Sequence, residues 1–262
     1  MTDGRRKVAL ITGGGTGVGA ASAHALAARG FDVAINYSRS ASEAETTVGT
    51  VRDAGAQAIA MQGSVADDAD CRRLVADTLS RFGRLDALVN SAGATQFAAL
   101  DDLEVQNAED FQRVYAVNLI GPYQMMRAAA DPLRASGAGA VVNVSSIAGV
   151  NGNGSSIAYI ASKGALNTLT LTMARLLAPK VRVNTVLPGL LDTRWLEAGL
   201  GSEAFAKVKE SFAAQSVLDD ICTADDVADA IAFLVCDARK MTGQLMPVDA
   251  GFLLGRGAKV SK

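Results

Sequence analysis

The chain has 262 residues, 49% of them hydrophobic, which is enough to bury one sizeable core, so we expect a single domain over residues 1–262. Its formal net charge is −2, and no run of Lys or Arg suggests a surface for phosphate backbones, so nucleic acid is not expected as a partner. An apolar signal segment and a stretch long enough to span a bilayer are both missing, so a cytoplasmic protein without membrane partners is expected.

Short β-branched runs alternate with long Ala- and Leu-rich stretches. The β-branched runs predict strands at Val8–Thr12, Val33–Tyr37, Ala58–Gln62, Ala87–Asn90, Ala140–Ser145, Val181–Leu187 and Gln244–Val248. The stretches between them predict helices at Ala20–Arg29, Ser42–Ala54, Asp68–Phe82, Ala108–Ala130, Tyr159–Leu177 and Ala224–Cys236. Strands that are apolar throughout are typical of a parallel sheet covered on both faces. We therefore expect a doubly wound α/β (Rossmann) fold with a seven-stranded parallel sheet, and a lid insertion at about 188–218.

Cysteine and histidine are too few and too scattered for a metal site or a disulfide framework. The three cysteines, Cys71, Cys222 and Cys236, are odd in number and far apart in the sequence. The one histidine, His24, lies among alanines of a predicted helix, which argues against a Ser-His-Asp hydrolase. We expect no bound metal.

A glycine-rich loop at residues 12–19 connects the first predicted strand to the first predicted helix. Glycines allow a tight turn and a close approach to a pyrophosphate, while the helix N-terminus offers free N–H groups. Alone, such a loop could be an ordinary turn, but the strand before it and the helix after it favour a dinucleotide site. The candidate cofactor-binding residues of this loop are Gly13, Thr16, Gly17, Val18 and Gly19.

The second predicted strand ends in a segment that bears on the choice of dinucleotide. Sites for NAD usually have a carboxylate here that binds the ribose hydroxyls. This chain instead has Ser38, Arg39 and Ser40, whose side chains can bind a 2′-phosphate by donating charge-assisted hydrogen bonds to it. The sequence favours NADP(H), with NAD(H) as the alternative if Arg39 is only a solvated loop residue.

Hydroxyl and amine side chains follow the fifth predicted strand. Ser145 ends that strand and Ser146 follows it, and Tyr159 and Lys163 open the long helix that comes next. Residues four apart share a helix face, so the ammonium of Lys163 is expected near the phenol of Tyr159. A nearby cation favours the phenolate, so we expect it to lower the pKa of Tyr159 toward a range useful for proton transfer.

With these motifs in this order, the chain resembles the short-chain dehydrogenase/reductase family, in its shorter subfamily, from Val8 to about Gly251. Further matches are Asn-Ser-Ala-Gly at residues 90–93, where the family most often has Asn-Asn-Ala-Gly, and Asn118. Pro188-Gly189, followed by Thr193, also fits the family pattern. Together these motifs are highly specific.

The resemblance implies roles for four catalytic residues. Tyr159 would exchange a proton with the substrate oxygen, and Ser146, which the family spacing favours over Ser145, would stabilise charge on that oxygen. Lys163 would lower the pKa of Tyr159 and bind the nicotinamide ribose. Asn118 would support Lys163 through an ordered water. The hydride itself would come from the cofactor.

The resemblance also implies further contacts with the cofactor. Thr193 would bind the nicotinamide carboxamide, and the amide of Val65 would bind the adenine edge, although many relatives have Asp where this chain has Ser64. Asn90 would support the sheet close to the cofactor. The remaining cofactor-binding candidates from these motifs are Ala92, Gly93, Tyr159, Lys163, Pro188 and Gly189.

Substrate and assembly are also expectations from the resemblance. The general pattern most resembles 3-oxoacyl-carrier-protein reductases, and apolar residues of the lid suit an apolar or mixed carbonyl or alcohol substrate. A non-catalytic NADP-binding sensor, or an NAD-dependent dehydrogenase of a polyol or sugar, remains the alternative. Relatives imply a homotetramer, with a dimer next. Met125, Met126 and Leu169 are candidates for the subunit seam, although core packing explains them equally well.

Overall fold

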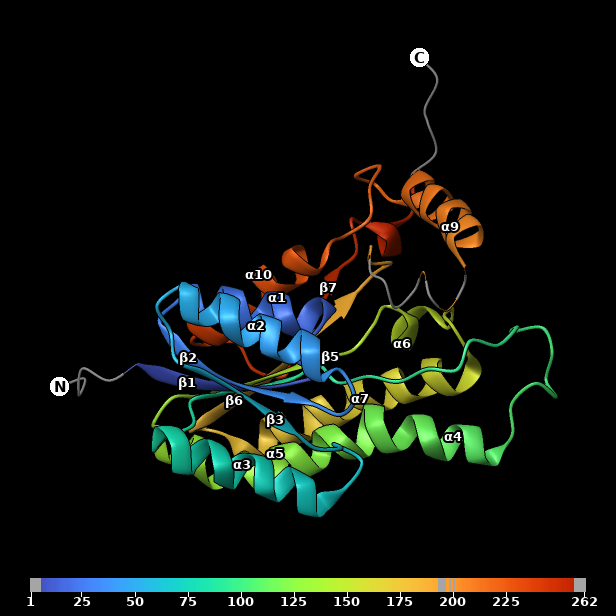
Figure 1. Ribbon diagram of the computed structural model, residues 1–262. Helices are drawn as coiled ribbons and strands as arrows, with labels where there is room; N and C mark the ends of the chain where they lie inside the picture. Colours follow the sequence, from blue (N-terminus) through green and yellow to red (C-terminus); the bar gives the residue numbers. More distant parts are fainter. Residues whose placement is uncertain (1–5, 193–196, 198, 200, 257–262) are drawn as a thin grey trace.

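The computed structural model describes residues 6–192, 197, 199 and 201–256, with one parallel sheet at its centre (Figure 1). Within these ranges the sheet has seven strands, β1 (Lys7–Thr12), β2 (Phe31–Tyr37), β3 (Ala58–Gln62), β4 (Ala87–Asn90), β5 (Gly139–Val144), β6 (Val181–Pro188) and β7 (Leu245–Val248). All neighbours are parallel, in the order β3-β2-β1-β4-β5-β6-β7. The predicted doubly wound Rossmann fold is confirmed.

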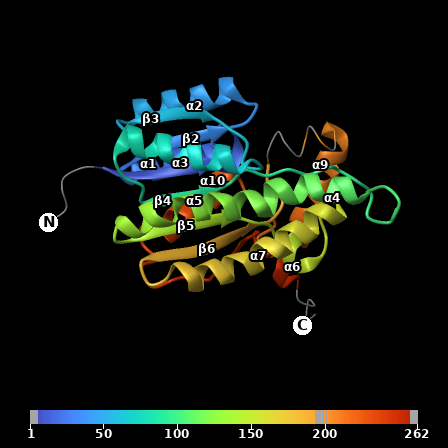
Figure 2. The same cartoon turned by 90° about the horizontal axis from the view of Figure 1, so that it is seen from below.

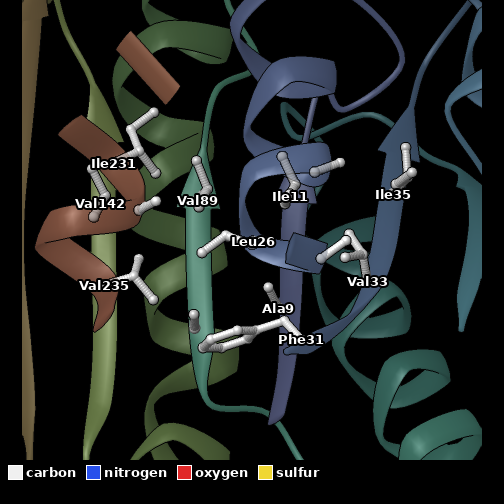
Figure 3. Close-up of a cluster of buried hydrophobic side chains, with 14 of the residues drawn as sticks. Ala9, Ile11, Leu26, Phe31, Val33, Ile35, Val89, Val142, Ile231 and Val235 are labelled. Atoms are coloured by element: carbon white, nitrogen blue, oxygen red, sulfur yellow. The ribbon is translucent and has the colours of Figure 1, made fainter. Parts of the chain in front are cut away.

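Helices cover both faces of the sheet because successive strand residues point to opposite sides. One face carries α1 (Gly17–Ala28), α2 (Ala41–Asp53) and α10 (Ala224–Cys236), and the other carries α3 (Asp68–Phe82), α5 (Gly121–Ala135) and α7 (Ile157–Leu177). In β1, Ile11 belongs to the hydrophobic core under α1, α2 and α10, and Leu10 belongs to the core under α3, α5 and α7. Figure 2 shows α3, α5 and α7 crossing the sheet, and Figure 3 shows Leu26 and Ile231 packed on the opposite face.

Side-chain caps fix where several helices begin. Asp67 accepts hydrogen bonds from two amides at the start of α3, and Thr223 forms a reciprocal capping box with Asp226 at α10. At α7, Ser156 accepts a hydrogen bond of 3.2 Å from the amide of Tyr159. The cap of α7 therefore orients the turn that carries the candidate proton donor.

The single helix predicted at Ala108–Ala130 is wrong in one respect, because a π-helical turn interrupts it. The structure has α4 (Ala108–Tyr115), the π turn η1 (Ala116–Ile120) and then α5. Pro122 has no backbone N–H and cannot donate to the carbonyl of Asn118, four residues earlier, which an α-helix would require. The π turn accommodates the missing hydrogen bond because its backbone pairs residues five apart, as the amide of Gly121 does with the carbonyl oxygen of Ala116. Asn118 lies in this wider turn.

Between β6 and α10, in the region predicted as a lid, lies α9 (Ser202–Gln215), apart from the helices that cover the sheet (Figure 1). Two short helices follow strands among the described residues, α6 (Ala148–Asn151) after β5 and η2 (Phe252–Leu254) after β7. Within the described ranges, no helix combines the length and apolarity that crossing a membrane requires.

Candidate active site

A large cleft lies at the carboxyl ends of the strands, where open α/β sheets bind their ligands. Its volume of about 1520 Å³ exceeds the ~300–1,000 Å³ of a usual small-molecule pocket and suits a dinucleotide together with a substrate. The sequence-predicted residues that line it are Gly13, Thr16, Gly17, Val18, Ser38, Arg39, Ser40, Ser64, Val65, Ala92, Gly93, Ser146, Tyr159, Lys163, Pro188 and Gly189. Segments that follow six strands therefore meet in one cleft.

The glycine loop turns from β1 into α1 where side chains have no room. Gly13 has φ +63°, and a Cβ built on it would lie 2.9 Å from the Cα of Ala92. A Cβ on Gly19 would lie 2.2 Å from the carbonyl oxygen of Gly13, so only glycine lets α1 begin this close to β1. Gly17 has φ +51° and lines the cleft. This bare backbone at a helix N-terminus fits the pyrophosphate of a dinucleotide.

Thr12 and Asn90 tie neighbouring strand ends together. Thr12 Oγ1 accepts hydrogen bonds of 3.1 Å from the amides of Ser91 and Ala92, which fixes the loop after β4 beside the glycine loop. Asn90 is 2% exposed, and its Nδ2 donates to Asn143 Oδ1 at 2.8 Å. The predicted structural role of Asn90 agrees with this contact. Thr12 was not singled out from the sequence, although it begins the Thr-Gly motif.

Two opposite charges lie at the end of the cleft formed after β2. Arg39 is exposed, and among the described residues it has no ion-pair partner. Glu43, in the first turn of α2, lines the same cleft. This end therefore offers a guanidinium for a phosphate and, close in sequence, a carboxylate for ribose hydroxyls.

The carboxylate of Asp70, which lies outside the predicted adenine-binding segment Ser64-Val65, supports that segment after β3. Asp70 Oδ2 accepts a hydrogen bond of 2.8 Å from the amide of Ser64. Arg73 pairs with Asp70 at 2.5 Å and donates to the carbonyl oxygen of Gln62 at 2.7 Å. Although Ser64 replaces the usual Asp, this pair from α3 holds the backbone of the predicted adenine segment.

Three candidate catalytic side chains meet at the junction of β5 and α7. Lys163 Nζ donates to the carbonyl oxygen of Val144 at 2.8 Å and lies 5.5 Å from the ring centroid of Tyr159. Ser146 forms a hydrogen bond with the phenol of Tyr159. Ser145 is buried, and its hydroxyl donates to the carbonyl oxygen of Lys163 at 3.1 Å. Of the two serines, Ser146 therefore presents its hydroxyl beside the phenol.

Burial controls the protonation of this pair. It raises the pKa of Tyr159 to about 12, while the hydrogen bond with Ser146 acts in the lowering direction. Burial also lowers the pKa of Lys163 to about 8, because the ammonium loses its hydration. The net shift of the Tyr159 pKa in the chain alone is therefore upward, opposite to the net lowering expected from the sequence. At neutral pH the phenol is protonated and can donate.

Asn118 connects the loop after β4 to α7. It is fully buried; its Oδ1 accepts from the amide of Ala94 at 2.8 Å, and its Nδ2 donates to the carbonyl oxygen of Ala94 at 2.8 Å. Nδ2 also lies 3.0 Å from Ser162 Oγ, one residue before Lys163. Ser162, a residue missed from the sequence, in turn donates to the carbonyl oxygen of Tyr159 at 2.7 Å.

The segment after β6 closes the cleft next to the candidate catalytic serine. The carbonyl oxygen of Pro188 lies 3.5 Å from Ser146 Oγ. A Cβ on Gly189 would lie 3.0 Å from Cζ of Phe212, so the ring of Phe212 packs directly over this glycine. Thr193, the predicted carboxamide contact, lies outside the described residues.

Known proteins are similar to this chain in sequence and in architecture. A family model described as short chain dehydrogenase matches residues 7–200. The "Granaticin polyketide synthase putative ketoacyl reductase 2" of Streptomyces violaceoruber is 40% identical over 93% of this chain and 95% of its own length. A 3-oxoacyl-[acyl-carrier-protein] reductase of Synechocystis sp. is 34% identical over 97% of this chain and 100% of its own length.

A solved structure agrees with these sequence relatives. The crystal structure of a "putative short-chain dehydrogenase/reductase" from Burkholderia xenovorans is 42% identical and has a TM-score of 0.89, covering 95% of this chain and 99% of that one. The matched family region contains the glycine loop, Ser146, Tyr159 and Lys163. The chain therefore belongs to the short-chain dehydrogenase/reductase family, whose members use a nicotinamide cofactor to act on CH–OH or C=O groups of small molecules, and it is homologous to ketoacyl reductases.

Proposed function

We propose that the protein is an NADP(H)-dependent oxidoreductase that moves a hydride between nicotinamide and a carbonyl or alcohol carbon, with a 3-oxoacyl thioester or another ketone as substrate. The observation that carries this proposal is the phenol of Tyr159, which lies in the cleft hydrogen-bonded to Ser146 and has Lys163 Nζ 5.5 Å from its ring centroid. The names of the relatives, a ketoacyl reductase and a 3-oxoacyl-carrier-protein reductase, favour ketone reduction.

The chain's own residues would manage the proton and the developing charge. The dinucleotide, once bound, supplies or accepts the hydride. In reduction, Tyr159 donates its proton to the carbonyl oxygen, and Ser146 donates a hydrogen bond to the same oxygen. Lys163, 5.5 Å from the ring centre, and Ser146 then stabilise the phenolate until a proton returns. Asn118 would keep α7 in register through Ser162. In oxidation the same steps run backwards.

The test of this function compares two neighbouring serines in one assay. Oxidation of NADPH and NADH is followed across ketones, acyl thioesters and, in reverse, polyols. We expect Ser146→Ala to lower kcat about 10²-fold, because it removes a donor to the developing oxyanion. Ser145→Ala should lose stability but keep most of the activity, because its hydroxyl is bonded to the carbonyl oxygen of Lys163. Equal losses would contradict the proposed role of Ser146.

Cofactor choice is proposed to depend on Arg39. We expect Arg39→Ala to weaken NADPH binding about 10- to 100-fold and NADH binding little, because charge-assisted hydrogen bonds are each worth ~1.5–3 kcal/mol. Dissociation constants from fluorescence titration of each cofactor measure the effect. Arg134→Ala is the control, since Arg134 is a half-buried arginine on α5, outside the cleft, that pairs with Asp131. Equal losses for both cofactors would remove Arg39 from the proposed phosphate site.

Two rival functions give different results in the same assays. An NAD-dependent dehydrogenase of a polyol or sugar is favoured by Glu43, the carboxylate that lines the cleft near Arg39. If that function is right, the wild type prefers NADH to NADPH, and Glu43→Gln weakens the binding of NADH. A non-catalytic NADP-binding sensor would bind NADPH but turn over none of the substrates. The hydroxyls of Ser146 and Tyr159 in the cleft argue against the sensor.

For assembly we propose a homotetramer, with a dimer as the alternative. Support comes from apolar side chains that stay exposed on the helices expected to pair, Tyr123 on α5 and Leu176 on α7, at 41% and 65%. Met125 and Met126, candidates for the seam, are 0% exposed in the single chain and belong to its core; Leu169 packs on the same core.

Three further expectations stay predictions. They are that the chain forms a single domain, that residues 188–218 act as a lid, and that the protein is cytoplasmic.

A further inference from the structure

The C-terminal turn (Asp249–Arg256) is attached to the end of α9, far from it in sequence. The guanidinium of Arg256 forms an ion pair with the carboxylate of Asp219, just beyond α9. The amide of Leu218 donates to the carbonyl oxygen of Ala250 at 3.1 Å. These two contacts join the C-terminal turn to the segment that follows the C-terminal end of α9.

Backbone strain is concentrated at the same joint. Asp219 has φ +56° and Ala250 has φ +52°, and they are the two non-glycine residues with positive φ among those that the structure describes. Left-handed backbone is unfavourable for residues with a Cβ and persists only where surrounding contacts hold it. Next to them, a Cβ on Gly251 would lie 2.9 Å from Cβ of Val217, which shows how closely the two segments pack.

Two aromatic rings meet where the C-terminal turn touches α9. Phe252 of η2 and Phe212 of α9 stack with their centroids 3.9 Å apart and their planes 6° from parallel. Both rings line the cleft, and Phe212 also covers Gly189. Pro188, the residue before Gly189, has its carbonyl oxygen 3.5 Å from Ser146 Oγ. The stack that covers Gly189 therefore borders the space where a substrate carbonyl would bind.

We propose that the C-terminal turn clamps α9 and that the stacked pair Phe212–Phe252 forms a wall of the substrate site that selects ketones carrying a planar aromatic group. The selection rests on the proposed function, whereas the clamp does not. A flat ring extends an aromatic stack and gains contact beyond simple burial, which a short aliphatic chain cannot do. Phe97, which follows β4, lines the same cleft and adds a further aromatic surface.

Hydrogen–deuterium exchange tests the clamp without any turnover. We expect Arg256→Ala and Phe252→Ala to speed exchange of the amides in α9, because each removes a contact that fixes this helix. Leu254→Ala is the matched control, since Leu254 lies on the same turn with 81% exposure. Amides of the central strand β4 report whether the whole chain has been destabilised. Unchanged exchange in α9 for both variants would overturn the clamp.

Selection is tested with acetophenone and 2-butanone as probes. For Phe252→Ala we expect kcat/KM with acetophenone to fall about tenfold, the equivalent of ~1.4 kcal/mol, with a much smaller change for 2-butanone. NADPH affinity should be unchanged. Equal losses for the two ketones would overturn the aromatic wall.

A binding arm separates the failure of this inference from the failure of the proposed function. Acetophenone is titrated into the complex of the protein with NADP⁺, where reduction cannot occur, and its heat of binding is compared between wild type and Phe252→Ala. Weaker binding in the variant supports the wall, and equal binding overturns it. A wild type that binds acetophenone but reduces neither ketone would instead contradict the proposed reduction.

Discussion

Replacing Tyr159 by Phe is expected to lower the rate of NADPH-dependent ketone reduction by about 10²–10⁴-fold, the usual contribution of a positioned general acid. The variant keeps the aromatic ring that lies 5.5 Å from Lys163 Nζ, so packing between Tyr159 and its neighbours should survive. It loses only the hydroxyl, whose pKa burial raises to about 12 and which therefore holds its proton at neutral pH. Steady-state kcat, followed through NADPH absorbance, measures the loss.

Cofactor binding and a second tyrosine provide the controls for this result. NADPH should still bind, because the lost hydroxyl serves the substrate oxygen in the proposed reaction. Tyr123→Phe removes a hydroxyl from an exposed position on α5 and should leave the rate as it is. If Tyr159→Phe retained near-normal turnover with folded protein, the proton would come from another group and the proposed mechanism would be wrong.

Local signals in the sequence were sufficient to predict most of the fold. The strand at Ala87–Asn90 has the predicted bounds, and its residues up to Val89 are apolar because both faces of the sheet are covered. Helices α3 and α10 also begin and end as predicted, since Asp67 and Thr223 cap them. The π turn was missed although Pro122 signalled it, because the apolar pattern runs on through the turn.

The candidate site was predictable where its residues are close in sequence. The glycine loop and the pair Tyr159–Lys163 are local motifs, and the cleft contains them. The support of Ser64 by Asp70, and the joint between Arg256 and Asp219, depend on how separate elements pack, which no local spacing encodes. The direction of the Tyr159 pKa also depends on burial, which outweighs the hydrogen bond with Ser146.

Replacing Lys163 by Met is expected to lower activity about 10²-fold while leaving the fold at least as stable at neutral pH. Activity falls because the phenolate of Tyr159 loses its nearby cation. The fold gains because Lys163 is 4% exposed, and a pKa near 8 against an ordinary 10.5 means that its charge costs about 3 kcal/mol of folding free energy. Losing the hydrogen bond to Val144 offsets ~1.5–3 kcal/mol of this gain.

The pH dependence identifies the buried charge as the cause. Because the pKa of Lys163 is lower in the folded chain than its ordinary 10.5, the wild type carries the full penalty below about pH 8 and progressively less up to about pH 10.5. The free energy of unfolding of Lys163→Met relative to wild type should therefore be most favourable at neutral pH and should decline as the pH rises. Urea unfolding across this range measures it. A difference that stays constant with pH would mean that Lys163 keeps its ordinary pKa, and the phenolate would then have a fully charged neighbour throughout.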